Sequence, residues 1–194
     1  FMIFWDPRTY LLHPFNLLKI WEGGMSFHGG FVGIVAAAYW YCRKHHLSFG
    51  QMADAMSIPT IFALALGRIA NFINGELWGR PWEGRWCVNF KNTGGGDICR
   101  HPSTLYGAGQ RFLVFLWLGF LSLKEQFSPG FIFWNFVFWE GLGRIIVDFY
   151  RENVLFLGFS LGQWFSLVMV ITALFVFVKK YREDWKSLLS KKKV

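Results

Sequence analysis

Long apolar stretches alternate with short polar segments along the whole chain. A helix that crosses about 30 Å of hydrocarbon needs about twenty mostly apolar residues, and most of these stretches approach that length. We therefore expect an all-α fold, a polytopic bundle of transmembrane helices with about five spans in this chain and a loop region on its outer face. The predicted spans cover residues 27–42, 52–72, 104–123, 130–148 and 160–178.

The polar segments between the stretches indicate an orientation. Basic residues follow the first predicted span at Arg43 and Lys44, and they dominate the last segment, 179–194. If the helices alternate in direction, both segments lie on one side, which the positive-inside rule makes cytoplasmic. We thus expect a basic cytoplasmic tail at 179–194 and an extracytoplasmic loop at 77–102. That loop is also basic, which weakens the rule there but suits the binding of an anionic headgroup.

The composition agrees with an integral membrane protein. Of 194 residues, 54% are hydrophobic, 21% aromatic and only 16% charged, whereas about a quarter of a soluble domain is charged. The net charge of +8 is concentrated in the tail, which favours an anchor on anionic lipid over a nucleic-acid-binding arm. No signal peptide precedes the first span. We expect a single domain, 1–194, that lacks its N-terminal membrane helices.

The cysteines predict neither a metal site nor a redox centre, because Cys42, Cys87 and Cys99 form no CxxC pair. Cys87 and Cys99 belong to one predicted loop. They would form a disulfide if the loop faced an oxidising compartment. Two free, half-buried thiols are the interpretation that we favour at this point.

The densest group of polar residues, 67–80, directly follows an apolar run. Arg68 and Asn71 are one helical turn apart and share a face. Asn74 and Glu76 would diverge from them in a continuous helix, but a break at Gly75 allows all four to converge on an unwound segment that lines a cavity. Helix caps and side chains that reach toward the headgroups are the alternative. Since the group holds both signs of charge and two amides, we favour a binding site.

Two histidines are candidates for proton transfer. His28 enters the first predicted span, where a side chain with a pKa near neutrality can act as a general base. A histidine that only forms hydrogen bonds at the interface remains an equal alternative. His101 is a weaker candidate and precedes Pro102, which marks a helix start with Ser103 or Thr104 as its cap. Such helix starts attract anions.

A third polar group lies in the fourth predicted span. Glu140, Arg144, Asp148 and Arg151 share one helical face with alternating sign, so a self-neutralising ladder is one interpretation. An arginine deep in a span usually faces an interior pathway. Arg144 and Arg68 would then supply two guanidinium groups from different helices, which suits a bidentate grip on one lipid phosphate.

Four segments together resemble the prolipoprotein diacylglyceryl transferase family. They are Gly-Met-Ser-Phe-His-Gly-Gly at 24–30, Gly-Arg-Ile-Ala-Asn-Phe-Ile-Asn-Gly-Glu at 67–76, His-Pro-Ser-Thr-Leu-Tyr at 101–106 and Gly-Arg-Ile-Ile-Val-Asp-Phe-Tyr-Arg at 143–151. The resemblance covers essentially the whole chain. It implies a seven-helix, multi-pass enzyme of the bacterial inner membrane, active toward the extracytoplasmic leaflet.

The resemblance also implies a reaction. The family transfers the diacylglyceryl group of phosphatidylglycerol to the lipobox cysteine thiol of a preprolipoprotein, which forms a thioether, releases glycerol phosphate and begins lipoprotein maturation. No cofactor or metal is implied. By the same resemblance the catalytic residues are His28, Arg68 and Arg144. The substrate-binding residues are Asn71, Asn74, Glu76, Gly79, His101, Ser103 and Tyr106.

This chain departs from the family pattern at Gly107, where the family usually has an acidic residue, and at Glu140, where it often has an aromatic one. Glu140 is expected to pair with Arg144 and to weaken its grip on phosphate, by about 1 kcal/mol or more if buried. We expect the full-length protein to be active and this chain alone to be inactive. The alternative function is a membrane protein that binds or transports anionic lipid without chemistry.

Overall fold

The structure is a computed structural model that describes residues 27–124, 127–153 and 155–189, with the side chains of 27–32 and 155 left out. The chain forms two compact units, one up to Phe49 and one from Gly50 onward. In the first unit the described helix is α3 (Phe27–Lys44). All further elements belong to the second unit, apart from the first residue of α4.

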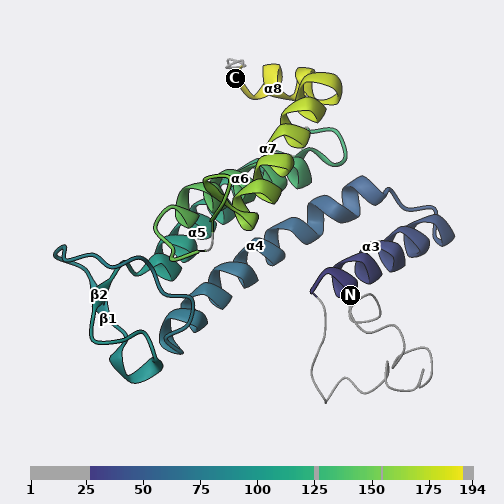
Figure 1. Cartoon of the computed structure of the whole chain (residues 1–194). Coiled ribbons are helices and arrows are strands. Elements are labelled where there is room, and N and C mark those ends of the chain that lie inside the picture. The colour runs from purple at the N-terminus through teal and green to yellow at the C-terminus, as the bar shows by residue number, and fades with distance from the viewer. Residues whose placement is uncertain (1–26, 125–126, 154, 190–194) are drawn as a thin grey trace, which may run out of the picture. The chain divides into compact units, whose positions relative to one another are not determined.

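The second unit is mostly helical (Figure 1). Its long helices are α4 (Phe49–Ile73), α5 (Ser103–Ser122), α6 (Phe131–Asp148) and α7 (Leu161–Lys180). With α3, they confirm the five apolar segments as helices, each within a few residues of its predicted bounds. The short elements are β1 (Val88–Asn89), the 3-10 helix η3 (Lys91–Thr93), β2 (Cys99–Arg100), β3 (Leu155–Phe156), β4 (Phe159–Ser160) and α8 (Arg182–Leu189).

Two of the described helices, α4 and α7, are long and apolar enough by themselves to cross a membrane. Large apolar side chains on the outer face of the bundle are exposed, such as Leu113 on α5 (68%) and Phe165 on α7 (68%). Exposed surfaces of this kind suit lipid rather than water. These helices therefore support the assignment as a membrane protein.

Helix α6 packs against both α5 and α7, and the pair α6–α7 makes the most extensive contact. The centre of this packing is apolar: Leu118 on α5, Phe131 on α6 and Ala173 on α7 are fully buried. Helix α4 joins through Ile61, also fully buried. Burial of each of the larger apolar side chains, Leu118, Phe131 and Ile61, stabilises the fold by about 1.5–3 kcal/mol.

One carboxylate ties α4 to the start of α6. Asp54 accepts hydrogen bonds from the backbone N–H groups of Gly130 (2.6 Å) and Phe133 (2.7 Å). The first N–H groups of a helix have no partner within the helix, so a carboxylate from a neighbour satisfies them and interacts favourably with the helix dipole. This contact helps to fix the position of α4 beside α6.

The loop between α4 and α5 contains a small covalently closed hairpin. Strands β1 and β2 pair antiparallel, with Asn89 opposite Cys99. Cys87 and Cys99 form a disulfide with a Cα–Cα distance of 5.4 Å. The expectation of two free thiols is therefore wrong, because the hairpin register brings these two cysteines together. The loop lies at the opposite end of this unit from α8 (Figure 1).

The segment 179–194, predicted as a tail, is partly folded. Helix α7 continues through Lys180, and α8 follows it. Asp184 is buried and accepts a hydrogen bond from the backbone N–H of Ser128 (2.8 Å), and the ring of Trp185 packs against Phe131 at 5.5 Å. The basic composition of the segment concealed an amphipathic helix that docks on the bundle.

Candidate active site

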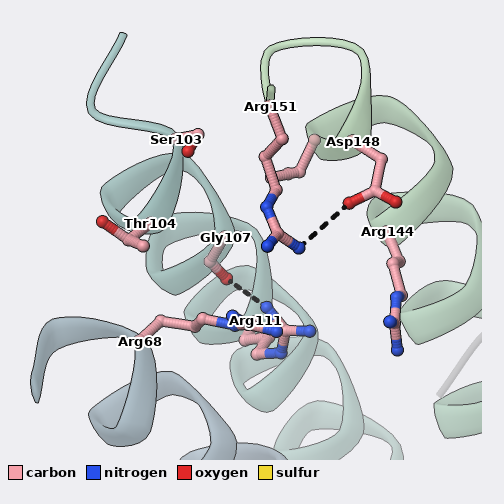
Figure 2. Close-up of a pocket in the computed structure, with 9 residues that line it drawn as sticks. Arg68, Ser103, Thr104, Gly107, Arg111, Arg144, Asp148 and Arg151 are labelled. Atoms are coloured by element: carbon pink, nitrogen blue, oxygen red, sulfur yellow. Dashed lines mark hydrogen bonds and ion pairs between the residues drawn. The ribbon is translucent and has the colours of Figure 1, made fainter. Parts of the chain in front are cut away.

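Four arginines from separate helices and a loop line one narrow cavity (Figure 2). Arg68 comes from α4, Arg111 from α5, Arg144 from α6, and Arg151 from the turn after α6. Asp148 is the single carboxylate in the lining. We call this the arginine cavity. The other lining residues are Ser103, Thr104, Gly107 and Val147.

Two of the arginines have carboxylate partners. Arg111 is buried (4% exposed) and forms an ion pair with Glu140 on α6, and its Nη1 donates to the Gly107 carbonyl at 3.1 Å. Arg151 lies 3.4 Å from the Asp148 carboxylate, which also accepts a hydrogen bond from Ser160 at 2.7 Å. These contacts hold both guanidinium groups in place.

Arg68 and Arg144 differ from this pair. Neither forms a hydrogen bond or ion pair within the part of the chain that the structure describes. Arg68 is half-buried and Arg144 is exposed. They are therefore the two arginines of this cavity without a carboxylate partner in the described chain. Both residues line this one cavity, and their predicted role in binding a phosphate stays a prediction.

Glu140 does not act as predicted. The sequence suggested that it would pair with Arg144, one turn further along the same helix. In the structure its carboxylate turns toward α5 and pairs with Arg111. The packing of α5 on α6 brings Arg111 to Glu140, so Glu140 does not pair with Arg144.

Glycines allow the arginines to come close. A Cβ atom at Gly107 would lie 3.1 Å from Nη1 of Arg111 and 3.7 Å from Cγ of Arg68. One at Gly162, in the first turn of α7, would lie 3.2 Å from Nη2 of Arg144 and 2.9 Å from Asp148. The cavity itself measures only about 10 Å³, roughly the space that one water needs. An anion as large as a phosphate must therefore move the arginine side chains apart.

A second, larger cavity of about 490 Å³ lies against the first. Four of its lining residues are the aromatic side chains Trp82, Trp86, Tyr106 and Tyr150. Val147 lines both cavities. We call this the aromatic cavity. Its remaining lining residues are His101, Gln110, Gly143 and Ile146.

His101 is held inside this aromatic lining. Its ring stacks on Trp82 with centroids 4.3 Å apart, and its Nδ1 lies 3.2 Å from the Tyr106 hydroxyl. That hydroxyl accepts a hydrogen bond from the indole N–H of Trp86 at 3.0 Å. Burial lowers the pKa of His101 below its usual range, so the neutral form is favoured. His101 and Tyr106 thus belong to the aromatic cavity, not to the arginine cavity.

The prediction that four polar residues at the end of α4 converge on a segment that lines a cavity holds only in part, because Asn71, Asn74 and Glu76 meet but Arg68 lies apart from them in the arginine cavity. Helix α4 ends at Ile73, and Gly75 has a positive φ of 65°. The Glu76 carboxylate then accepts hydrogen bonds from the side-chain amides of Asn71 (2.7 Å) and Asn74 (3.4 Å). None of the three lines either cavity. Their predicted role in substrate binding stays a prediction.

Gly79 and Ser103 shape the entrance to α5. A Cβ at Gly79 would lie 2.2 Å from the His101 carbonyl oxygen, so only glycine fits this approach. Ser103 lines the arginine cavity. It is the first residue of α5, and its hydroxyl donates to the Leu77 carbonyl at 3.3 Å. The predicted side-chain cap is therefore wrong: Pro102 occupies the N-cap position, and no side-chain cap hydrogen bond forms.

His28 lies in the first turn of α3. Its side chain is outside the described residues, and α3 belongs to the first unit. Its role as a base stays a prediction.

Sequence reasoning gave no site role to Arg111 or Gln110, and it considered Thr104 only as a helix cap. Arg111 carried a usable signal, because it is an arginine inside an apolar helix, and such residues normally face a functional interior. Gln110 and Thr104 carried no comparable signal, since single neutral polar residues are common in helices of this kind.

Apolar helices, two of them long enough to cross a membrane, around an arginine-lined cavity define a helical membrane protein. The chain belongs to the prolipoprotein diacylglyceryl transferase family, whose model matches residues 1–179.

Individual relatives agree with this assignment. The chain is 39% identical to a phosphatidylglycerol–prolipoprotein diacylglyceryl transferase of Polynucleobacter asymbioticus, over 91% of this chain and 69% of the relative. It is 38% identical to one of Zymomonas mobilis (95% and 66%) and 39% identical to one of Geobacter sulfurreducens (90% and 68%). The chain thus spans about two thirds of the length of these relatives.

Proposed function

We propose that the protein transfers the diacylglyceryl group of phosphatidylglycerol to the lipobox cysteine thiol of a preprolipoprotein. The observation that carries this proposal is the convergence of Arg68 and Arg144, from different helices, on one cavity. Family membership supplies the reaction class, and the relatives named above carry both substrates in their names.

The arginines act on the phosphate. Arg68 and Arg144 bind the phosphodiester of the lipid through paired N–H groups, which match its oxygens in a bidentate manner. When the bond between glycerol carbon and phosphate oxygen breaks, negative charge grows on that oxygen. Fixed positive groups stabilise this charge more strongly than water does, because they need no reorganisation. Arg151, oriented by Asp148, adds a third positive group.

The thiol of the acceptor is the nucleophile, so none of the three cysteines of this chain takes part. The thiol loses its proton to a base, for which His28 is the candidate. Asn71, Asn74 and Glu76 form one hydrogen-bonded group at the end of α4. In this proposal they orient the glycerol part of the lipid at the edge of the site, and Gly79 shapes the turn beside it.

The orientation forms part of the proposal. We place the protein in the bacterial inner membrane as a multi-pass protein, with the loop 77–102 on the extracytoplasmic side and the C-terminus in the cytoplasm. The Cys87–Cys99 disulfide supports this, because disulfides persist in oxidising compartments. A membrane-impermeant thiol reagent tests it: after reduction, the loop cysteines react in intact spheroplasts, and a cysteine introduced at Lys186 does not.

An activity assay tests the function. Full-length protein mixed with phosphatidylglycerol and a lipobox peptide is expected to form the diacylglyceryl thioether, detected by mass spectrometry. Arg68→Ala should lose most of this activity, while Arg85→Ala, an exposed loop arginine, should retain it. Full activity in Arg68→Ala would contradict the phosphate role. Lipid binding without product from well-folded protein would instead indicate a binding protein.

A further inference from the structure

The aromatic cavity has no role in the phosphate chemistry described above, although it is the larger of the two cavities. It adjoins the arginine cavity. Neighbouring residues line opposite cavities: Tyr106 and Gly107, Gly143 and Arg144, Tyr150 and Arg151. Val147 lines both cavities, so they adjoin at this residue. An occupant of the aromatic cavity at this boundary therefore borders whatever the arginines bind.

A buried polar atom of Gln110, which lines the aromatic cavity, lacks a hydrogen-bond partner in the described chain. The Gln110 side chain donates from Nε2 to the Trp139 carbonyl at 3.0 Å. Its Oε1 is buried and accepts no hydrogen bond within the described chain. The amide is also held tightly, since a Cβ at Gly143 would lie 2.1 Å from Nε2. Oε1 is thus a fixed hydrogen-bond acceptor that has no donor within the described chain.

A hydrocarbon chain is a poor occupant for this reason. It would leave Oε1 unsatisfied, at a cost of about 1–3 kcal/mol. A thiol S–H or a peptide N–H would satisfy it. The aromatic rings of the cavity also favour a polarizable sulfur over a methylene by up to about 1 kcal/mol.

His101 provides a second polar group of defined direction. The indole of Trp86 can only donate to the Tyr106 hydroxyl, and that hydroxyl finds an acceptor when it donates to Nδ1 of His101. The neutral ring then carries its proton on Nε2. An Nε2–H group can donate to a sulfur that gains negative charge.

The geometry of substitution at carbon agrees with these contacts. A nucleophile that displaces a phosphate from a saturated carbon attacks from the side opposite the departing oxygen. With the phosphate among the arginines, the attacking atom approaches from the far side of the carbon, at about 3–3.5 Å. The aromatic cavity borders the arginine cavity across Val147, which suits such an approach.

We propose that the aromatic cavity holds the acceptor, the cysteine side chain of the lipobox segment, with Gln110 and His101 as its polar contacts. This inference rests on the proposed function. The sulfur forms a bond to the glycerol carbon, the carbon–oxygen bond breaks with its electron pair on the phosphate oxygen, and the thiol proton goes to the base. Gln110 determines acceptor binding, whereas Arg68 and Arg144 act on the lipid phosphate.

Steady-state kinetics with both substrates varied tests this division. Gln110→Met removes the acceptor oxygen and should raise the KM for a lipobox peptide about five- to tenfold, with the KM for phosphatidylglycerol unchanged. Ile146→Trp, which fills the cavity, should act in the same direction. Leu113→Trp, at an exposed position on α5 outside both cavities, is the control. A change confined to the lipid KM would overturn the proposal.

Photo-cross-linking tests the same point in unmodified full-length protein. A lipobox peptide with a photoreactive residue beside its cysteine should attach to Trp82, Tyr106 or Tyr150. A phosphatidylglycerol with a photoreactive acyl chain should not. Labelling of these residues by the acyl chain alone would overturn the inference. Absence of thioether product in wild-type protein would instead refute the proposed function, and cross-linking would still identify the occupant of the cavity.

Discussion

The arginine cavity and the aromatic cavity share Val147 in their linings but differ in size and in charge. The first is small and has four guanidinium groups around about 10 Å³ of space. The second is about 490 Å³ in volume, with mostly uncharged lining and only a few polar atoms. A small cavity lined by positive groups suits a group that must be bound tightly while its own negative charge increases. A larger cavity with few charged groups suits a neutral group that must be positioned.

The two cavities also differ in what holds them in place. One buried ion pair between α5 and α6, Arg111–Glu140, and the local pair Arg151–Asp148 hold the arginine cavity, whereas the aromatic cavity depends on a loop that carries Trp82 and Trp86. Substitutions in the first should therefore act on bundle stability or on the chemical step. Substitutions in the second should act on acceptor binding.

The largest effect is expected from Arg144→Ala. Loss of one group that stabilises charge in the transition state typically costs about 100- to 1000-fold in rate, and we expect this loss in kcat/KM. The loss should be equal for different lipobox peptides, because Arg144 acts on the phosphate that all of them displace. Steady-state rates with several peptides measure it. A loss that varies strongly between peptides would place Arg144 in acceptor binding and break the comparison.

Glu140→Gln is expected to destabilise the bundle. It leaves Arg111 buried without its carboxylate, and breaking a buried ion pair in this way costs about 3–5 kcal/mol. Replacement of both partners, in Glu140→Gln with Arg111→Met, should restore most of that stability. Unfolding in mixed detergent micelles gives the free energies. If the single and double variants were equally unstable, the ion pair would not be the cause.

Glu140 and Arg111 also show which kind of contact the sequence could not predict. The helix positions were predictable, because the apolar runs that bury against lipid and against each other are local in sequence. The partner of Glu140 was not, since it lies 29 residues away on another helix. Periodicity along α6 pointed to Arg144, but the packing of α5 against α6 decided the contact. Arg68 and Arg144 were predictable because each stands out within an apolar segment.

The structure of the loop 77–102 was predicted less well for a similar reason. Whether Cys87 meets Cys99 depends on the register of a hairpin of two-residue strands, and no hydrophobic pattern specifies such a register. The division of the site into two cavities was also invisible. Adjacent residues such as Tyr106 and Gly107 face different cavities, and only the helix geometry separates them.

Removal of the disulfide should have an intermediate effect, confined to the aromatic cavity. In the variant with Cys87→Ser and Cys99→Ser, the loop loses a cross-link between residues 12 apart, worth about 2–3 kcal/mol against opening. We expect faster proteolysis of the loop and a higher KM for the peptide, because Trp82 and Trp86 lose their support. The KM for phosphatidylglycerol should stay unchanged. An equal rise in both KM values would show that the loop supports both cavities.

The smallest effect is expected at the exposed ion pair of the same loop. Lys91 donates to Asp97 at 2.6 Å and Asn89 donates to it at 2.8 Å, and these hydrogen bonds lower the pKa of the Asp97 carboxyl below its usual range. A carboxyl with a lowered pKa in the folded loop stabilises that loop above its ordinary pKa, and the contribution is lost as the pH falls through the lowered value. Because the pair is exposed and screened by salt, Asp97→Asn should leave both KM values unchanged at neutral pH. The rate of loop proteolysis, measured across the acidic pH range, tests this. The rate in wild-type protein should approach the rate in Asp97→Asn as Asp97 becomes protonated. A marked effect of Asp97→Asn at neutral pH would mean that charge, and not the disulfide, holds the wall of the aromatic cavity.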